Sequence, residues 1–374
     1  MIKNILFLLI CLYTLPTIGQ ISYPFDNVKE NNDLLAYWYN IPKDSMHLKM
    51  VNKTFQFYST IEVYGKTKQD SFALKIEVYQ EYSKKIFNEE FFIKNKKTDK
   101  DCQLSFINDC FKLVYPVEYA GNNPDKIILT ISDSNGQRTK EIQCRYHKLY
   151  GRVYDFGGNP FKSFITIRPD DFNFNTSIWS DSLGYYEIEL PERTYNDIAV
   201  VDEDYGIKVA EAWGWHIIMD TDQNMDFKIG TGEVYNLNVW PNNGGGSTYF
   251  VSFRPMSLHL YGNAGNPQPV NINGKEFKLI NLIPKLEIKD IKVLVNGKEC
   301  TIFSIQEYFE TGSENGAVKA YLLQIDKKGL NKTGKQNLLL EFNLEEEIDG
   351  KKISHNAVGY FQFFTNFHGL SNYY

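Results

Sequence analysis

FALKIEVYQEY, residues 72–82, places an apolar side chain at every second position from Phe72 to Val78. Alternation with a period of two predicts a β-strand that buries one of its faces. The same pattern recurs along the chain, in TFQFYSTIEVYG (54–65), KIILTISDSNGQRTKEIQC (126–144) and IKVLVNGKECTIFSI (291–305). The sequence therefore predicts strands almost throughout.

Turn residues separate these strands. Asn-Gly and Asp-Gly pairs supply the positive φ angles of a tight hairpin turn. They occur at Asn135-Gly136, Asn273-Gly274, Asn296-Gly297 and Asp349-Gly350. The best helical candidate is only the short stretch NDLLAYWYN, residues 32–40. An aromatic content of 15% also suits packed sheets better than helical bundles, so the predicted fold class is all-β.

Length, charge and cysteine content limit the number of domains, the partners and the cofactors that the protein can have. The length of 374 residues predicts two or three domains. A formal net charge of −6 favours solubility and lacks the basic footprint of nucleic-acid binding, so we expect no nucleic-acid partner. Cys102 and Cys110 could pair in an oxidising compartment, although their spacing does not require it. With Cys144 and Cys300 they form neither a disulfide framework nor a zinc pattern, and we expect no cofactor.

The N-terminal stretch MIKNILFLLICLYTLPTIGQ, residues 1–20, has the parts of a secretory signal peptide. Lys3 precedes a short apolar run, and Gly19 is a small residue at the expected cleavage site. The run falls short of the ~20 residues of a membrane span, which disfavours the alternative of a membrane anchor. Cys11 lies inside the run, so a lipoprotein anchor is not indicated. We expect residues 1–19 to be removed and the protein to be exported, to the periplasm, the cell surface or the medium.

Domain boundaries are predicted where turn residues cluster. PNNGGGS, residues 241–247, holds three consecutive glycines and reads as a linker or a long surface loop. A second change of pattern occurs where one strand ends and the stretch beginning GRVYD follows. The predicted divisions are an N-terminal sandwich at 21–147, a middle sandwich at 148–240 and a C-terminal sandwich at 248–374.

The middle segment carries the most specific motifs. GRVYDFGGNPFKSFITI, residues 151–167, contains the pattern G-x-V-x-D-x-x-G-x-P. Asp155 can cap a turn, Gly158 can take a conformation that a side chain would forbid, and Pro160 fixes the direction in which the chain leaves. SDSLGYYEIELP, residues 180–191, adds a D-x-x-G-x-Y turn. The motif residues are Gly151, Val153, Asp155, Gly158, Pro160, Asp181, Gly184 and Tyr186.

Together the two motifs resemble those of the carboxypeptidase regulatory-like domain, a small transthyretin-like (prealbumin-like) β-sandwich. The flanking runs are similar to exported multi-domain proteins of Bacteroidetes-type bacteria: DEDYGIKVAEAWGWHIIMD (202–220), KIGTGEVYNLNVW (228–240) and FRPMSL (253–258). The resemblance implies a transthyretin-like domain between other β-sandwich modules, with a structural or binding role for this domain. The strand pattern of the flanking segments predicts Ig-like sandwiches, so the expected order is Ig-like, transthyretin-like, Ig-like. In carboxypeptidases this domain follows a zinc peptidase domain, and the chain has no HExxH motif of such a domain.

MDTDQNMDFKIG, residues 219–230, resembles the start of a calcium loop, because oxygen-bearing side chains occupy alternate positions. These side chains belong to Asp220, Asp222, Asn224 and Asp226. An EF-hand loop also needs a glycine at position six and a glutamate at position twelve, where this chain has Met225 and Thr231. We therefore interpret the stretch as a hairpin-like connection between strands, with calcium as a weak candidate and no catalytic metal.

No motif meets the requirements of a catalytic site. A G-x-S-x-G nucleophile elbow is missing, and sequence alone cannot place the carboxylates of 169–171, 201–206 and 344–350 across a cleft. The tryptophans, with many tyrosines, could form a sugar-stacking platform. They are Trp38, Trp179, Trp213, Trp215 and Trp240. Trp213 and Trp215 share strand parity, however, and are predicted to face a sandwich core.

These patterns predict an exported, non-enzymatic binding or scaffolding protein of the cell envelope, with a glycan or a surface protein as its partner. The first alternative is a divergent secreted hydrolase or an accessory subunit of one. The second is a structural component that assembles through exposed sheet edges. Paired carboxylates lining a cleft would favour the enzyme, whereas a flat exposed row of aromatic side chains would favour the binding protein.

Overall fold

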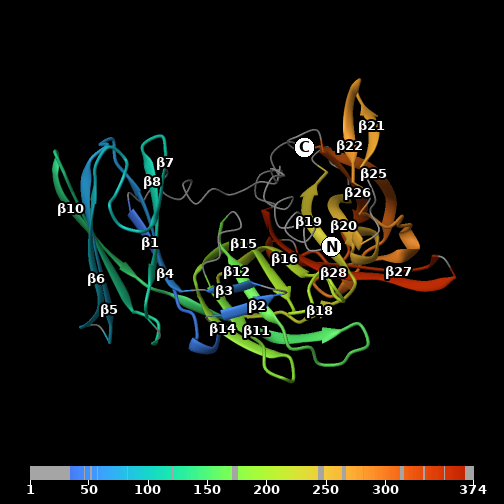
Figure 1. Cartoon of the computed structure of the whole chain (residues 1–374), viewed down its shortest axis with the longest axis horizontal. Helices are drawn as coiled ribbons and strands as arrows, with labels where there is room; N and C mark the ends of the chain where they lie inside the picture. Colours follow the sequence, from blue (N-terminus) through green and yellow to red (C-terminus); the bar gives the residue numbers. More distant parts are fainter. Residues whose placement is uncertain are drawn as a thin grey trace.

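The computed structural model describes residues 34–366 except 46, 51–52, 57, 82, 120, 171–175, 243–247, 263–266, 281, 312–315, 332 and 349. This part of the chain is a series of β-sandwiches arranged along the longest axis of the molecule (Figure 1), which confirms the all-β fold class. None of its helices is long and apolar enough to cross a membrane. The predicted signal peptide at 1–19 lies outside the described residues.

The N-terminal sandwich packs two four-stranded sheets, β1-β4-β8-β7 and β10-β9-β5-β6, face to face. Alternate residues of β5 point into the core, where Leu74, Ile76 and Val78 are fully buried, as the opening stretch predicts. The elements are β1 (Leu34–Tyr39), η1 (Lys43–Ser45), β2 (His47–Met50), β3 (Lys53–Gln56), β4 (Ser59–Lys66), β5 (Phe72–Gln80), β6 (Lys84–Ile93), β7 (Gln103–Ile107), β8 (Cys110–Val117), β9 (Lys126–Asp133) and β10 (Gly136–Gln143).

The helical candidate at 32–40 is wrong. Residues 34–39 form β1, which pairs antiparallel with β4. Leu34, Ala36 and Trp38 lie on one side of this strand and are buried in the sandwich core. A short apolar run fits a helix or a strand equally well, and here the neighbouring sheet decides.

The predicted hairpin turns are present. At 273–274 and at 296–297 both residues have positive φ, as a two-residue hairpin turn requires. The pair at 135–136 differs: Gly136, with φ +120°, is the first residue of β10, and Asn135 does not have a positive φ. Gly350 lies between β27 and β28 with φ +72°. Residue 349 is outside the described residues.

The middle sandwich packs a small sheet, β14-β11-β17 with β18 also on β11, against one end of an eight-stranded sheet. The order of the large sheet is β13-β12-β15-β16-β28-β27-β23-β24. The strands that the middle segment contributes are β11 (Tyr146–Asp155), β12 (Phe164–Arg168), β13 (Thr176–Trp179), β14 (Tyr185–Pro191), β15 (Arg193–Val201), β16 (Ala212–Met219), β17 (Gln223–Asn224) and β18 (Phe227–Ile229).

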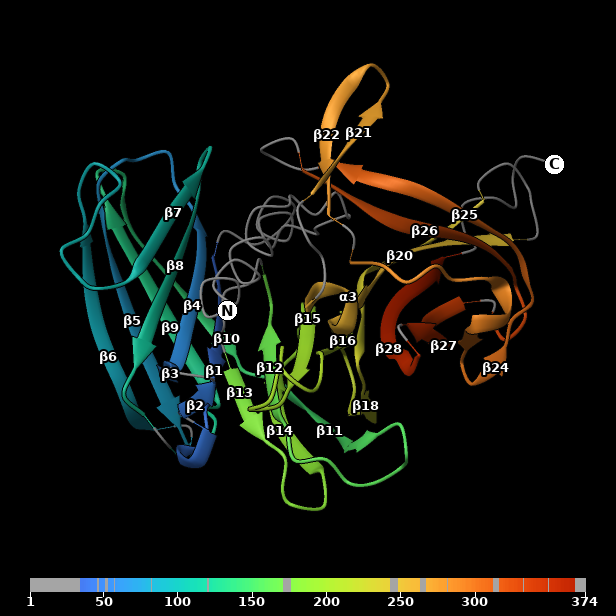
Figure 2. The same cartoon turned by 45° about the vertical axis from the view of Figure 1, so that its right-hand side comes forward.

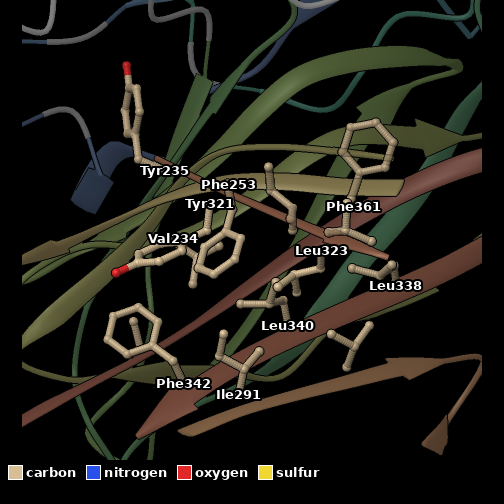
Figure 3. Packing of buried hydrophobic residues seen from close by; sticks show 14 of the residues in the cluster. Val234, Tyr235, Phe253, Ile291, Tyr321, Leu323, Leu338, Leu340, Phe342 and Phe361 are labelled. Atoms are coloured by element: carbon tan, nitrogen blue, oxygen red, sulfur yellow. The ribbon is translucent and has the colours of Figure 1, made fainter. Parts of the chain in front are cut away.

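The C-terminal sandwich packs the other end of the eight-stranded sheet against the sheet β19-β20-β26-β22-β21, on which β25 also pairs with β26. The β21–β22 hairpin projects from this sandwich (Figures 1 and 2). The elements are β19 (Gly232–Pro241), β20 (Thr248–Ser257), α3 (Leu258–Gly262), β21 (Gln268–Ile272), β22 (Lys275–Leu279), η2 (Ile288–Asp290), β23 (Ile291–Val295), β24 (Lys298–Glu299), β25 (Ile302–Thr311), β26 (Gly316–Asp326), β27 (Thr333–Ile348) and β28 (Lys351–Asn366). Figure 3 shows side chains from both sheets meeting in its core, among them Phe253, Tyr321, Leu323, Leu338, Leu340 and Phe342.

The eight-stranded sheet is shared, because β16 pairs in parallel with β28 through Trp213–Gly359 and Trp215–Phe361. Trp213 and Trp215 face the core of the C-terminal sandwich, stacked at 4.8 Å, which confirms their predicted burial. Beyond His216, whose φ is +53°, Ile217 and Met219 face the core of the middle sandwich instead. The sheet is therefore covered on both faces at β16.

Strands cross both boundaries of the predicted middle domain, and β11 (Tyr146–Asp155) already spans the one at 147/148. β19, which that division places in the middle domain, pairs antiparallel with β20 of the C-terminal segment. Residues 243–247 of the predicted linker lie outside the described residues. The division into three domains itself stays a prediction.

The four described cysteines are free thiols. In the β7–β8 hairpin Ile107 pairs with Cys110 beside the turn, whereas Gln103 pairs with Val114 at the far end. Cys102 precedes Gln103, so the two cysteines lie at opposite ends of the hairpin and do not pair.

A buried ionic cluster joins the N-terminal and middle sandwiches. Arg193 of β15 donates to Glu62 of β4 at 2.8 Å and to Asp170, which follows β12, at 3.2 Å. Lys112 of β8 lies 3.1 Å from Glu62 and 2.5 Å from Asp170. Burial opposes ionisation of Asp170, yet Arg193 and Lys112 hold its pKa below the usual value. Tyr39 also donates to Glu62, at 2.9 Å, so Arg193, Lys112 and Tyr39 all contact the fully buried carboxylate.

Candidate functional site

The outer face of the β14-β11-β17 sheet carries a row of tyrosines, which we call the tyrosine face: Tyr150, Arg152 and Tyr154 of β11 with Tyr185 of β14. The exposed fractions of Tyr150 and Tyr185 are 39% and 52%. The Arg152 guanidinium lies 4.9 Å from the ring centre of Tyr154 and 4.6 Å from that of Tyr185. Its Nε donates to the carbonyl of Leu183 at 2.7 Å, so the stack is held in place by the backbone.

Polar groups surround the tyrosine face. Glu187 lies opposite Tyr150 in the β11–β14 register and accepts from Lys148 at 2.7 Å. Asn224 lies beside Tyr150 on the other side and is exposed. The face thus combines aromatic rings with a cation, a carboxylate and an amide, the groups that bind and orient a sugar ring.

The predicted motif residues lie directly behind this face. A side chain at Gly151 would overlap the Met225 carbonyl oxygen, and the close approach lets the Tyr186 hydroxyl donate to that oxygen at 2.7 Å. Gly184 has φ +80°, and its carbonyl accepts from the Val153 N–H at 2.9 Å. These residues fix how β11, β14 and β17 lie together.

The two motif turns are closed by their aspartates. Asp155 accepts from the Asn159 N–H at 2.8 Å, Gly158 has φ +83°, and Pro160 bridges back to Tyr154. Asp181 accepts from the N–H groups of Leu183 and Tyr185 at 2.8 and 2.9 Å. Both turns therefore form the edge of the tyrosine face.

The calcium candidates bind protein donors instead of one another. Asp222 accepts from the Lys148 N–H at 2.8 Å and Asp226 from the Arg152 N–H at 2.9 Å. Asp222 thus bonds β11 just before the residues that pair with β17, and Asp226 bonds it between those that pair with β17 and those that pair with β18. Asp220 accepts from the Lys335 ammonium on β27. Within the described ranges, no three His, Cys, Asp or Glu side chains are arranged to hold a metal ion.

The interpretation of 219–230 as a hairpin-like connection is wrong. The stretch leaves β16 in the large sheet and crosses to the small sheet, where β17 and β18 run parallel to β11. Asp222 and Asp226 accept hydrogen bonds from backbone N–H groups along this crossing. In the sequence, acids spaced in this way look the same as the start of a calcium loop.

The tryptophans do not form a platform. Trp38, Trp213 and Trp215 are buried, Trp179 is partly buried, and Trp240 is 41% exposed. The exposed row consists of tyrosines, which the sequence analysis missed. The sequence did hold a signal for them: Tyr150, Arg152 and Tyr154 occupy alternate positions of YGRVY, and a further tyrosine, Tyr185, directly follows the glycine of the D-x-x-G turn.

A serine, a histidine and a carboxylate also meet, between β20, β28 and β27. The Ser257 hydroxyl lies 2.7 Å from Nδ1 of His355, and the Nε2 of His355 lies 3.3 Å from Glu346 without a hydrogen bond of good geometry. Burial keeps the pKa of His355 below its usual value, despite the opposing effect of Glu346. Ser257 is buried and accepts from the Leu260 N–H at 3.2 Å, so its hydroxyl caps α3 and has partners on both sides.

Comparisons with known proteins leave the family open. No protein-family model matches the chain, and no curated protein matches it. Among solved structures, the Bacillus anthracis TIE protein is 10% identical, with 86% of this chain and 72% of that chain covered and a TM-score of 0.18. The major pilin subunit of Bacillus cereus is 10% identical, with 57% and 68% covered and a TM-score of 0.17. Similarities this weak carry no argument, and the resemblance to the carboxypeptidase regulatory-like domain stays a prediction.

Proposed function

We propose that this chain is an exported, non-catalytic binding protein and that the tyrosine face binds glycan. The observation that carries the proposal is the Tyr154–Arg152–Tyr185 stack, in which the guanidinium lies 4.9 and 4.6 Å from the two ring centres, beside the exposed rings of Tyr150 and Tyr185. Tyrosine rings offer apolar faces to a sugar ring, while the flanking Glu187 and Asn224 can accept and donate hydrogen bonds. Aromatic side chains grouped in this way on a surface indicate a binding site.

A glycan array probed with the mature protein tests the proposal. We expect binding to at least one polysaccharide class and a loss of about tenfold or more in affinity for Tyr185→Ala, because each anchoring contact contributes on the order of 1–2 kcal/mol. Phe92→Ala is the matched control, since Phe92 is 62% exposed on the distant N-terminal sandwich. An array without any bound glycan would contradict the proposal.

A hydrolase is the second candidate, favoured by the Ser257–His355–Glu346 arrangement. Such a triad needs a serine oxygen free to attack its substrate, whereas the Ser257 oxygen is hydrogen-bonded to the Leu260 N–H. We expect the protein not to hydrolyse p-nitrophenyl esters. Hydrolysis that disappears in Ser257→Ala would instead establish the enzyme.

An assembly role is the third candidate, favoured by β25. Among the described strands, this ten-residue strand pairs only with β26, and Phe303 and Phe309 are 56% and 37% exposed. A long edge strand with exposed apolar side chains can pair with another chain. Light scattering tests this role: a defined oligomer that Phe309→Lys dissociates would support it, and a monomer at high concentration would exclude it.

A further inference from the structure

A pocket opens where the loop between β15 and β16 meets α3 and the end of β20, away from the tyrosine face. Its walls are largely apolar, and a single carboxyl group lies among them. The lining residues used in the argument below are Tyr205, Glu233, Met256, Leu258, Tyr261 and Leu282.

The carboxyl group of Glu233 is incompletely bonded. Its Oε1 accepts a long hydrogen bond of 3.4 Å from the Glu211 N–H, and its Oε2 is buried without a hydrogen-bond partner. The Trp213 indole N–H lies near enough to lower the pKa of Glu233, but Nε1 of Trp213 also lacks a partner of good geometry. Glu233 is only 3% exposed, so water does not freely solvate the unpaired oxygen. A buried acceptor in this state is costly unless a donor reaches it.

The surroundings of Glu233 favour a cation as that donor. The Tyr205 hydroxyl, also buried and without a partner, belongs to the same pocket. The loop that carries Tyr205 is acidic, with Asp202, Glu203 and Asp204 directly before it. Lys208 pairs with Asp204 at 2.6 Å, which leaves the loop with a surplus of negative charge. The Arg254 guanidinium also acts on Glu233, but it is already paired with Glu310 at 2.7 Å. An anionic ligand would therefore be repelled, whereas a cation is attracted from solution.

We propose that this pocket binds a primary alkylammonium group, from either a free amine or a lysine side chain. The ammonium group donates to Oε2 of Glu233, and its remaining hydrogens point toward the Tyr205 hydroxyl, since an ammonium carries three donors. The pocket has room for the ammonium group and the first methylene groups, which lie against Met256, Leu258 and Leu282, and the rest of the chain extends out of its open side. Tyr261 closes the wall with an aromatic ring, a favourable neighbour for a cation.

Saturation-transfer NMR with n-butylamine, n-butanol and butyrate tests the proposal on the mature chain. At pH 8, where Glu233 is ionised, we expect n-butylamine to bind at least tenfold more tightly than n-butanol, and butyrate not to bind. Glu233→Gln, which keeps the shape of the side chain and removes its charge, should weaken n-butylamine binding tenfold or more. Glu203→Gln is the matched control and should leave binding within about twofold, because Glu203 is exposed and does not line the pocket.

The remaining outcomes separate the amine from other occupants. Equal binding of n-butanol would show an apolar cavity, and absence of binding would show a pocket that holds only water; either result overturns the proposal. Stabilisation by Ca²⁺ or Na⁺ that displaces n-butylamine would assign the site to a metal ion and also overturn it. Nα-acetyl-lysine methylamide identifies the source: binding like that of n-butylamine indicates a lysine side chain, and binding of n-butylamine alone indicates a free amine. Melting temperatures confirm that each variant is folded.

Discussion

Removing Arg193 from the ionic cluster should destabilise the protein far more than breaking a similar ion pair on the surface. Arg193→Met keeps the apolar part of the side chain beside Tyr37, whose ring centre is 4.5 Å from the guanidinium. It leaves Glu62 and Asp170 with Lys112 as the cation of the cluster, so one buried negative charge is uncompensated. Losing one member of a buried ion pair costs about 3–5 kcal/mol.

The matched control is Lys148→Met. Lys148 lies 2.7 Å from Glu187, a separation close to the 2.8 Å between Arg193 and Glu62, but its side chain is 45% exposed whereas that of Arg193 is 7% exposed. An exposed ion pair contributes at most about 1 kcal/mol. The comparison therefore isolates the effect of burial at almost equal distance.

Urea denaturation followed by fluorescence measures both variants without the screening that guanidinium salts introduce. We expect a lower midpoint for Arg193→Met and an early transition of the N-terminal sandwich, because the ionic cluster joins it to the middle sandwich. Adding Asp170→Asn should recover part of the loss, since the cluster then holds one charge of each sign. If Arg193→Met were no less stable than Lys148→Met, the burial argument would be refuted.

Three further predictions follow from single contacts. Gly151→Ala should cost about 2 kcal/mol or more, because its new methyl group would overlap the Met225 carbonyl oxygen, and thermal melting measures the loss. Burial raises the pKa of Glu233 from about 4.5 to about 7, and burial together with the charge of Glu233 raises the pKa of Glu211, so the folded state of this pair holds extra protons and stability should fall as the pH rises from about 4.5 to about 7. The loss is on the order of 3 kcal/mol, and the difference between wild type and Glu233→Gln in urea titrations at pH 5 and pH 8 should show it. Chelation should leave the melting temperature unchanged, because protein groups bond the carboxylates of 220–226; a clear drop would restore the calcium site.

Sequence pattern predicted much of the fold. Alternation in β5 and the Asn-Gly pairs at the hairpin turns are local signals, and local signals decide strands and turns. The short apolar run at 32–40 was misread, because only β4, some 25 residues further on, shows that it is a strand. Similarly, nothing in the sequence around Trp213 reveals that its strand pairs with Gly359.

The candidate sites were harder to predict, because each depends on which strands become neighbours. The tyrosine face needs the register that sets Arg152 opposite Tyr185. The alternating acids of 219–230 fit a calcium loop until the parallel pairing with β11 supplies their donors. Glu233 reads as an ordinary polar residue before a strand, and its burial becomes visible only once the loop carrying Tyr205 is in place.

The position of β28 has a consequence for how the chain folds during synthesis. β28 is the last described strand, yet it fills the place beside β16, about 140 residues earlier in the chain. The ribosome synthesises β16 long before β28, so the edge of β16 that pairs with β28 stays unpaired while the C-terminal half of the chain is made. Contacts of such long sequence separation form late and slowly. The middle sandwich therefore cannot reach its final form until translation is nearly finished, and a chain released early would present an open sheet edge to its neighbours.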